Sequence, residues 1–98
     1  VPEGRHVLAK HLVIHGRVQG VGYRDSAVQA AFMLNISGWV RNRSDGTVEA
    51  HAQGAPDAVD RFVDWCKEGP PLAPVSKVDA IDAPVDAALR DFAWRATA

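Results

Sequence analysis

The chain has 98 residues, of which 47% are hydrophobic and 23% are charged, and its formal net charge is -1. This length and composition predict a single globular domain, 1–98, with one modest core, and they argue against a disordered chain. A net charge so close to zero offers no general field for nucleic acid or for an anionic membrane. We therefore expect neither partner, and any anion site must be built locally.

The chain shows no pattern typical of export or of membrane anchoring. Cys66 is its single cysteine, so an intramolecular disulfide is impossible, and this favours a reducing compartment. No apolar run is long enough to span a bilayer, and there is no signal-peptide pattern. We therefore expect a cytoplasmic monomer with a flexible leader at residues 1–6.

The first predicted elements are a strand and a helix joined by a glycine-rich segment. Leu8–His15 is rich in aliphatic residues and stops at a glycine, which predicts a strand. Asp25–Leu34 predicts a helix that ends near Asn35, because asparagine tolerates the left-handed conformation that often closes a helix. The apolar face of this helix is expected to hold three residues, Val28, Ala31 and Phe32.

A hairpin and a second helix follow. Trp39–Arg43 and Thr47–Gln53 flank the turn-forming pair Asp45-Gly46 and predict two antiparallel strands. Pro56 opens the second helix, and Gly69-Pro70-Pro71 ends it. Four apolar residues recur with helical spacing and predict its buried face: Val59, Phe62, Val63 and Cys66. The cysteine is thus expected to serve packing rather than catalysis.

Two further strands complete the prediction, at Val75–Ile81 and, more briefly, at Phe92–Thr97. The order predicts an α+β, ferredoxin-like βαββαβ sandwich, with two helices on one face of an antiparallel sheet and a short extra C-terminal strand. In this topology the first two strands run in the same direction. The loop after the first strand and the hairpin after the second therefore emerge at one end, where Asn42 can approach Arg24.

The segment GRVQGVGYR, which spans Gly16–Arg24, combines three glycines with two arginines. Glycines allow successive backbone N–H groups to point into one concavity, and the start of the following helix adds positive charge there. Arg24 supplies a planar guanidinium that matches two phosphate oxygens. The segment is either an anion-binding loop or a glycine-rich turn whose arginine reaches water. Its glycines match neither the dinucleotide-binding fingerprint nor a P-loop.

Together with GWVRNRSDGTVEAHAQG and GPPLAPVSKV, this segment resembles the acylphosphatase family over most of the chain. The resemblance implies a ferredoxin-like enzyme that hydrolyses the carboxyl-phosphate bond of small acyl phosphates by in-line attack of water. It also implies that Arg24 binds the phosphate and that Asn42 positions the water, as the catalytic residues. Tyr23 stands where the family commonly has phenylalanine, and Asn35 where a glycine often follows the helix. The implied phosphate-binding residues are Gly16, Arg17, Val18, Gln19, Gly20, Val21, Gly22, Tyr23 and Arg24.

The implied reaction requires no cofactor and no metal. Hydrolysis of an acyl phosphate expels a carboxylate, which is a good leaving group, so positioning and electrostatic stabilisation should suffice. Inorganic phosphate and sulfate, as tetrahedral anions, are expected to compete with the small-molecule substrate for the loop. Four histidines are scattered without the spacing of metal ligands: His6, His11, His15 and His51.

Three alternatives remain open at this point. Related folds bind RNA through aromatic residues on the sheet, but the chain has no RNP1-like string and only 7% aromatic residues. A carbamoyl-phosphate-handling domain of a larger hydrogenase-maturation transferase carries a similar loop, and a non-catalytic phosphate-binding module would carry the same residues. The three tryptophans are expected in or at the edge of the core rather than around a substrate: Trp39, Trp65 and Trp94.

Overall fold

Two helices and five strands make up residues 6–98, the part of the chain that the computed structural model describes. Most of the predicted leader, residues 1–5, lies outside this described range. The elements are β1 (Leu8–Gly16), α1 (Tyr23–Leu34), β2 (Ser37–Asn42), β3 (Val48–Gly54), α2 (Pro56–Glu68), β4 (Val75–Asp82) and β5 (Phe92–Arg95). No helix in this range is long and apolar enough to cross a membrane.

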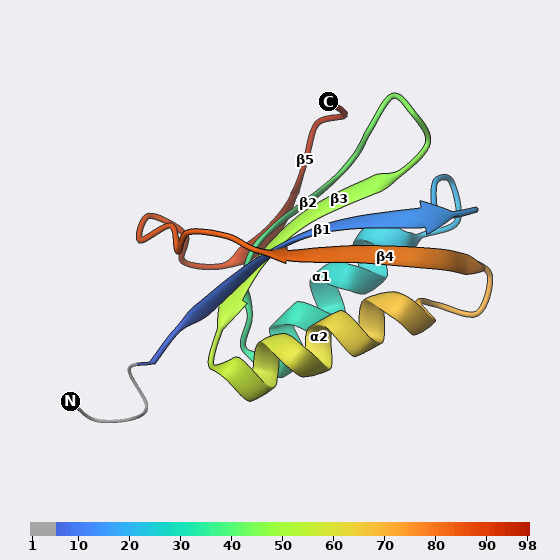
Figure 1. Cartoon of the computed structure of the whole chain (residues 1–98). Coiled ribbons are helices and arrows are strands. Elements are labelled where there is room, and N and C mark those ends of the chain that lie inside the picture. The colour runs from blue at the N-terminus through green and yellow to red at the C-terminus, as the bar shows by residue number, and fades with distance from the viewer. Residues whose placement is uncertain (1–5) are drawn as a thin grey trace.

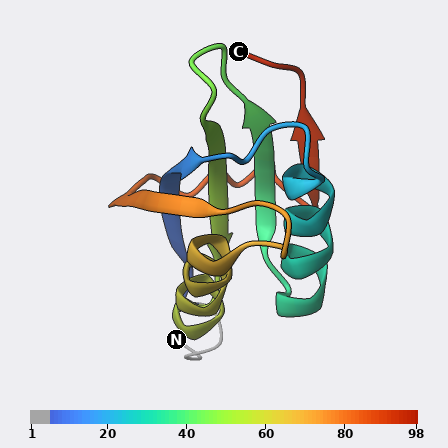
Figure 2. The same ribbon diagram turned by 90° about the vertical axis from the view of Figure 1, so that its right-hand side faces the viewer.

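The strands form one sheet in the order β4-β1-β3-β2-β5. The pairs β4-β1, β1-β3 and β3-β2 are antiparallel, whereas β5 lies parallel to β2. Both helices cover the same face of this sheet (Figures 1 and 2). The predicted ferredoxin-like α+β fold is therefore confirmed, and the extra strand makes the sheet mixed rather than purely antiparallel.

The core lies between the sheet and the two helices. From α2 it receives Val59, Phe62 and Cys66, with Val63 partly buried, as the helical spacing predicts. The prediction for α1 is partly wrong, because Phe32 is 81% exposed. That helix instead buries three residues four positions apart: Tyr23, Ala27 and Ala31.

The two ends of α1 differ in how well the sequence predicts them. The helix begins at Tyr23, two residues earlier than predicted, directly after Gly22 in the left-handed conformation (φ 81°). It ends as predicted at Asn35, which is also left-handed (φ 62°). The early start matters for the site, because it brings the first turn of the helix up to the glycine-rich loop.

The sheet topology places two loops at the same end of the molecule. Both β1 and β2 pair antiparallel with β3, so they run in the same direction. The loop that follows β1 and the hairpin between β2 and β3 consequently emerge together (Figure 1). This arrangement, which the element order predicts, sets the position of the candidate site.

Candidate functional site

A small cavity of about 170 Å³ lies between the glycine-rich loop, the first turn of α1 and the end of β2. Arg24 and Asn42 both line it, so the structure brings together the two residues that the sequence proposes as catalytic. The complete lining consists of Val18, Gly20, Gly22, Tyr23, Arg24, Asp25 and Asn42.

The backbone at this cavity is shaped by two glycines. Gly20 (φ 74°) and Gly22 (φ 81°) adopt left-handed conformations that other residues rarely accept. The carbonyl of Gly22 accepts the N–H of Ser26, which is the first hydrogen bond of α1. The N–H groups of the residues just before Ser26 have no acceptor within the helix, and they carry its partial positive charge. This end of α1 can therefore bind an anion.

Arg24 adds a full positive charge to the same place. It lies in the first turn of α1, its side chain is half-buried, and it lines the cavity. Its guanidinium carbon lies 4.7 Å from the centre of the Trp94 ring. A guanidinium at this position has the planar set of donors needed to hold two oxygens of one phosphate.

Asn42 contributes an acceptor that the protein leaves unpaired. It is the last residue of β2, and its Oδ1 is buried without a hydrogen-bond partner, the one such side-chain atom in residues 6–98. Its backbone carbonyl, in contrast, accepts the N–H of Ala98 at 3.0 Å. A buried oxygen without a donor is unfavourable, so a water or a ligand hydroxyl is the natural partner for Asn42 in this cavity.

A side chain of the loop fastens it to the neighbouring hairpin. The amide nitrogen of Gln19 donates to the carbonyls of Arg43 and Thr47, at 2.8 Å each. Because those two residues flank the hairpin turn just after Asn42, the bonds connect the two sides of the cavity. Gln19 is not among the residues that line the cavity, and its hydrogen bonds hold the loop against the hairpin.

The nine residues of the predicted phosphate-binding segment divide into two groups. Five of them line the cavity: Val18, Gly20, Gly22, Tyr23 and Arg24. Gly16 and Arg17 instead lie beside the start of β4, where the Arg17 N–H donates to the carbonyl of Pro74 at 3.1 Å. Val21 packs against the core.

The histidines of the strands are paired with different partners. His11 contacts Glu49 at 2.6 Å, and His15 contacts Asp79 at 3.0 Å. His51 is buried and contacts Gln53 at 2.8 Å. Within residues 6–98 no three of the His, Cys, Asp and Glu side chains gather as a metal site would require.

Cys66 lies deep in the core, as predicted. Burial raises the pKa of its thiol to about 12, although the Tyr23 hydroxyl nearby acts in the opposite direction. The thiol therefore stays protonated at neutral pH, which suits packing and not nucleophilic attack. The Tyr23 hydroxyl itself donates to the Cys66 carbonyl at 2.9 Å and so ties the start of α1 to α2.

Trp94 is the residue near the site that the sequence does not predict. Trp39 and Trp65 are half-buried, in agreement with a place at the edge of the core, but Trp94 is 55% exposed and packs against Arg24. The contact depends on the parallel pairing of β5 with β2. Residues 24 and 94 are so far apart in the chain that no local pattern could have indicated it.

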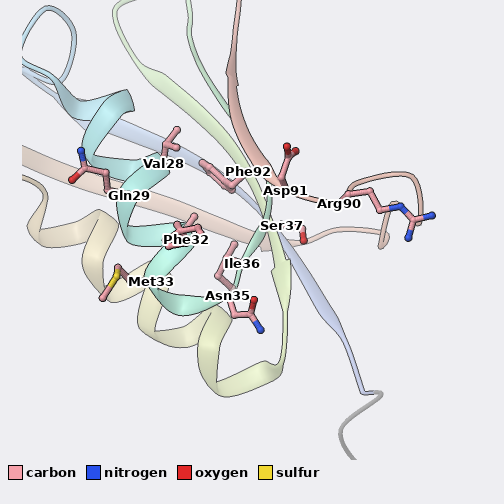
Figure 3. Close-up of a pocket in the computed structure, with 11 residues that line it drawn as sticks. Val28, Gln29, Phe32, Met33, Asn35, Ile36, Ser37, Arg90, Asp91 and Phe92 are labelled. Atoms are coloured by element: carbon pink, nitrogen blue, oxygen red, sulfur yellow. The ribbon is translucent and has the colours of Figure 1, made fainter.

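A larger cavity lies elsewhere in the molecule. It measures about 740 Å³ and opens beside the C-terminal half of α1, next to Phe32, Met33 and Phe92 (Figure 3). Its walls are mainly apolar, and the side chain of Arg90 extends away from it. It has neither the glycine backbone nor the helix N-terminus of the smaller cavity, so it offers no comparable place for a phosphate.

Comparisons with known proteins agree on one family. The family model described as Acylphosphatase matches residues 10–94. An acylphosphatase of Acidovorax sp. (strain JS42) is 56% identical over 77 residues, which are 79% of each chain. One of Cupriavidus pinatubonensis is 47% identical over 87 residues, 89% of this chain and 94% of the relative.

Solved structures point in the same direction. An acylphosphatase from Coxiella burnetii superposes with a TM-score of 0.87 at 37% identity and covers 93% of this chain and 95% of its own. Full-length HypF, in a phosphate- and nucleotide-bound form, matches with a TM-score of 0.85 at 26% identity. That match covers 94% of this chain but 12% of HypF, so the similarity is to one part of a much larger protein.

Proposed function

The chain belongs to the acylphosphatase family and hydrolyses acyl phosphates, and we propose that it does so in the cavity between Arg24 and Asn42. One observation carries this assignment. Arg24, the first turn of α1 and Asn42, whose side-chain oxygen is buried and unpaired, all line one cavity of about 170 Å³. An acceptor for water and two sources of positive charge for a phosphate are the parts that the reaction needs.

The positive groups hold the phosphate. Arg24 donates to two phosphate oxygens, while the free N–H groups at the start of α1 and the backbone of Gly20 and Gly22 surround the others. These donors are fixed in place before the substrate arrives. They therefore stabilise the charge that the equatorial oxygens carry in the transition state without reorganising.

Asn42 holds the nucleophile. Its Oδ1 accepts a hydrogen bond from one water, so that the water oxygen faces the phosphorus in line with the acyl oxygen. A new bond forms between that oxygen and phosphorus, the phosphorus–acyl oxygen bond breaks, and the carboxylate departs with the electron pair. The two protons of the water stay with the phosphate, which is released as dihydrogen phosphate. The products are a carboxylate and inorganic phosphate. Because the transition state is loose, positioning and electrostatic stabilisation account for the catalysis.

We further infer that the reaction proceeds without a metal on small acyl phosphates, since a carboxylate leaves readily and the site is built around the phosphate. Inorganic phosphate and sulfate should compete for the same donors. The single cysteine favours a reducing compartment, and we infer that the domain acts in the cytoplasm.

The family matches favour this function over the alternatives. The acylphosphatases of Cupriavidus pinatubonensis and Coxiella burnetii correspond to this chain over nearly their whole length, whereas HypF corresponds over 12% of its own. The unpaired Asn42 oxygen also favours an enzyme over a module that only binds phosphate. The phosphate oxygens are hydrogen-bond acceptors, and the Asn42 oxygen is an acceptor too, so it would contribute little to phosphate binding but can accept a hydrogen bond from water.

Substitution of Arg24 tests the assignment. Arg24→Ala should reduce kcat/KM for benzoyl phosphate by roughly 10²- to 10³-fold and raise the Kd for inorganic phosphate, while Arg24→Lys should retain part of both. Arg61→Ala removes the same charge from an exposed position of α2 and should leave both constants unchanged. Assays contain excess chelator and follow release of inorganic phosphate, with Kd taken from calorimetry.

Two results would contradict the proposal. An Arg24→Ala variant with normal phosphate affinity would place the site elsewhere. Activity that disappears with chelator and returns with zinc or magnesium would show that the metal-free mechanism is wrong.

A further inference from the structure

We propose that Trp94 is a positioning residue, which holds the Arg24 guanidinium in the orientation that receives the phosphate. This inference rests on the proposed function of Arg24 and extends the site to β5. Trp94 is not among the residues that line the cavity, so it acts through Arg24 and not on the substrate.

The fold holds Trp94 against the start of α1. Phe92, two residues earlier on β5, is 8% exposed and packs on Phe62 of α2 with ring centres 5.4 Å apart. Alternate residues of a strand share a face, so Trp94 lies on the helix-covered side of the sheet as well. In the parallel register it stands beside the buried Val40 of β2. The backbone of Trp94 is therefore fixed by strand pairing, while 55% of the residue remains exposed to solvent.

The contact leaves the hydrogen-bonding groups of Arg24 available. The guanidinium carbon lies 4.7 Å from the ring centre, and Arg24 lines the cavity in this same conformation. A cation above an aromatic face is attracted by the ring quadrupole and gives up none of its N–H donors. A free arginine side chain samples many rotamers and loses that freedom on binding. The stack with Trp94 removes part of this loss before phosphate arrives.

The protein contains a matched control for this contact. Trp39 on β2 carries two similar stacks, with Arg41 at 4.8 Å and Arg95 at 4.9 Å. Its neighbour Val40 belongs to the core, so Trp39 projects from the opposite face of the sheet. Trp39 does not line the cavity, and replacing it removes two tryptophan–arginine contacts without touching Arg24.

The test compares Trp94→Leu, Trp94→Phe and Trp39→Leu with the unmodified chain. We expect Trp94→Leu to raise the Kd for inorganic phosphate and the KM for benzoyl phosphate by about two- to fivefold, the range of an exposed cation–π contact, while kcat changes less. Trp94→Phe keeps an aromatic face and should restore most of the affinity. Trp39→Leu should leave Kd and KM unchanged. Urea unfolding of each variant identifies any general loss of structure.

A spectroscopic measurement separates positioning from a structural role. The Arg24 guanidinium lies over the indole ring, so the chemical shift of its Nε–H should change in Trp94→Leu and stay the same in Trp39→Leu. Phosphate affinity that is unchanged or tighter in Trp94→Leu overturns the inference, while loss of affinity in Arg24→Ala leaves the proposed function standing. Normal affinity in Arg24→Ala overturns both.

Discussion

The side-chain oxygen of Asn42 lies buried without a donor from the protein, an arrangement that lowers stability and suits catalysis. Asn42→Ala should therefore lower kcat by roughly 10²-fold, the scale expected when a reacting group is misplaced by about an ångström. The Kd for phosphate should hardly change, because Arg24 and the start of α1 remain. The urea midpoint should stay the same or rise. Steady-state kinetics, calorimetry and unfolding on one preparation measure all three.

A purely structural Asn42 predicts the opposite set of results. If its side chain capped the hairpin, Asn42→Ala would lose about 1 kcal/mol of stability and keep its turnover. Near-normal kcat with a lowered urea midpoint would therefore remove Asn42 from the mechanism.

The sequence predicts the position of a site residue only where the order and direction of the strands determine it. It does not predict a position that depends on a long-range side-chain contact. Arg24 and Asn42 meet because β1 and β2 run in the same direction, and the order of elements implies that direction. Trp94 meets Arg24 through the pairing of β5 with an edge of the sheet. Which edge a short last strand joins depends on long-range packing that no segment of the sequence records.

At the scale of elements, the site depends on the connection between the glycine-rich loop and the β2–β3 hairpin. Gln19→Ala removes the two hydrogen bonds that its amide donates to the hairpin carbonyls. We expect a loss of about 1–2 kcal/mol in the free energy of unfolding and a higher KM, since the loop is then less well ordered. Urea titration and hydrogen exchange of the loop amides measure these effects.

An exposed glutamine on α1 provides the control. Gln29→Ala should leave both stability and KM close to those of the unmodified chain. If Gln19→Ala behaved in the same way, the hydrogen bonds across the loop would contribute nothing to the site.

The two helices differ in how well the hydrophobic pattern of the sequence predicts their buried face. In α2 the apolar residues recur on one side and polar residues occupy the rest, so the pattern identifies the buried face. In α1 apolar residues occur on several sides of the helix, so the pattern does not identify which side is buried. The small side chains of Ala27 and Ala31 let α1 approach the sheet closely, and that packing turns Phe32 outward.

At the scale of the whole molecule, one carboxylate ties together the three central strands. Glu49 of β3 is 2.6 Å from His11 of β1 and 2.7 Å from Arg41 of β2, and its side chain is 13% exposed. Burial by itself would raise the pKa of Glu49, but the hydrogen bonds from His11 and Arg41 and their charges outweigh it, so the pKa lies below its ordinary value of 4.5. Ionised Glu49 therefore stabilises the folded state above pH 4.5, and this stabilisation is lost as the pH falls through the lowered pKa.

Glu49→Gln tests this dependence of stability on pH. At pH 7 the substitution should cost about 1–2 kcal/mol of unfolding free energy, because charged hydrogen bonds are replaced by neutral ones. The difference from the unmodified chain should shrink as the pH falls below 4.5 and through the lowered pKa of folded Glu49, beneath which Glu49 is protonated in both the folded and the unfolded state. Urea titrations between pH 7 and pH 3 follow the difference, with Glu68→Gln at an exposed position of α2 as the control. A difference that stays constant with pH would contradict the role of the Glu49 charge.

The order of strands in the sheet also determines what a growing chain exposes during its synthesis. Both edges of the sheet, β4 and β5, come from residues 75–95, whereas the three central strands are complete by residue 54. At a synthesis rate of about 5–20 residues per second, roughly two to eight seconds separate the end of β3 from the end of β5. Until β4 covers β1 and β5 covers β2, these two strands are unpaired on their outer sides, and such unpaired strands are templates for aggregation. The strand that brings Trp94 to Arg24 is thus also the last one to cover an edge of the three central strands.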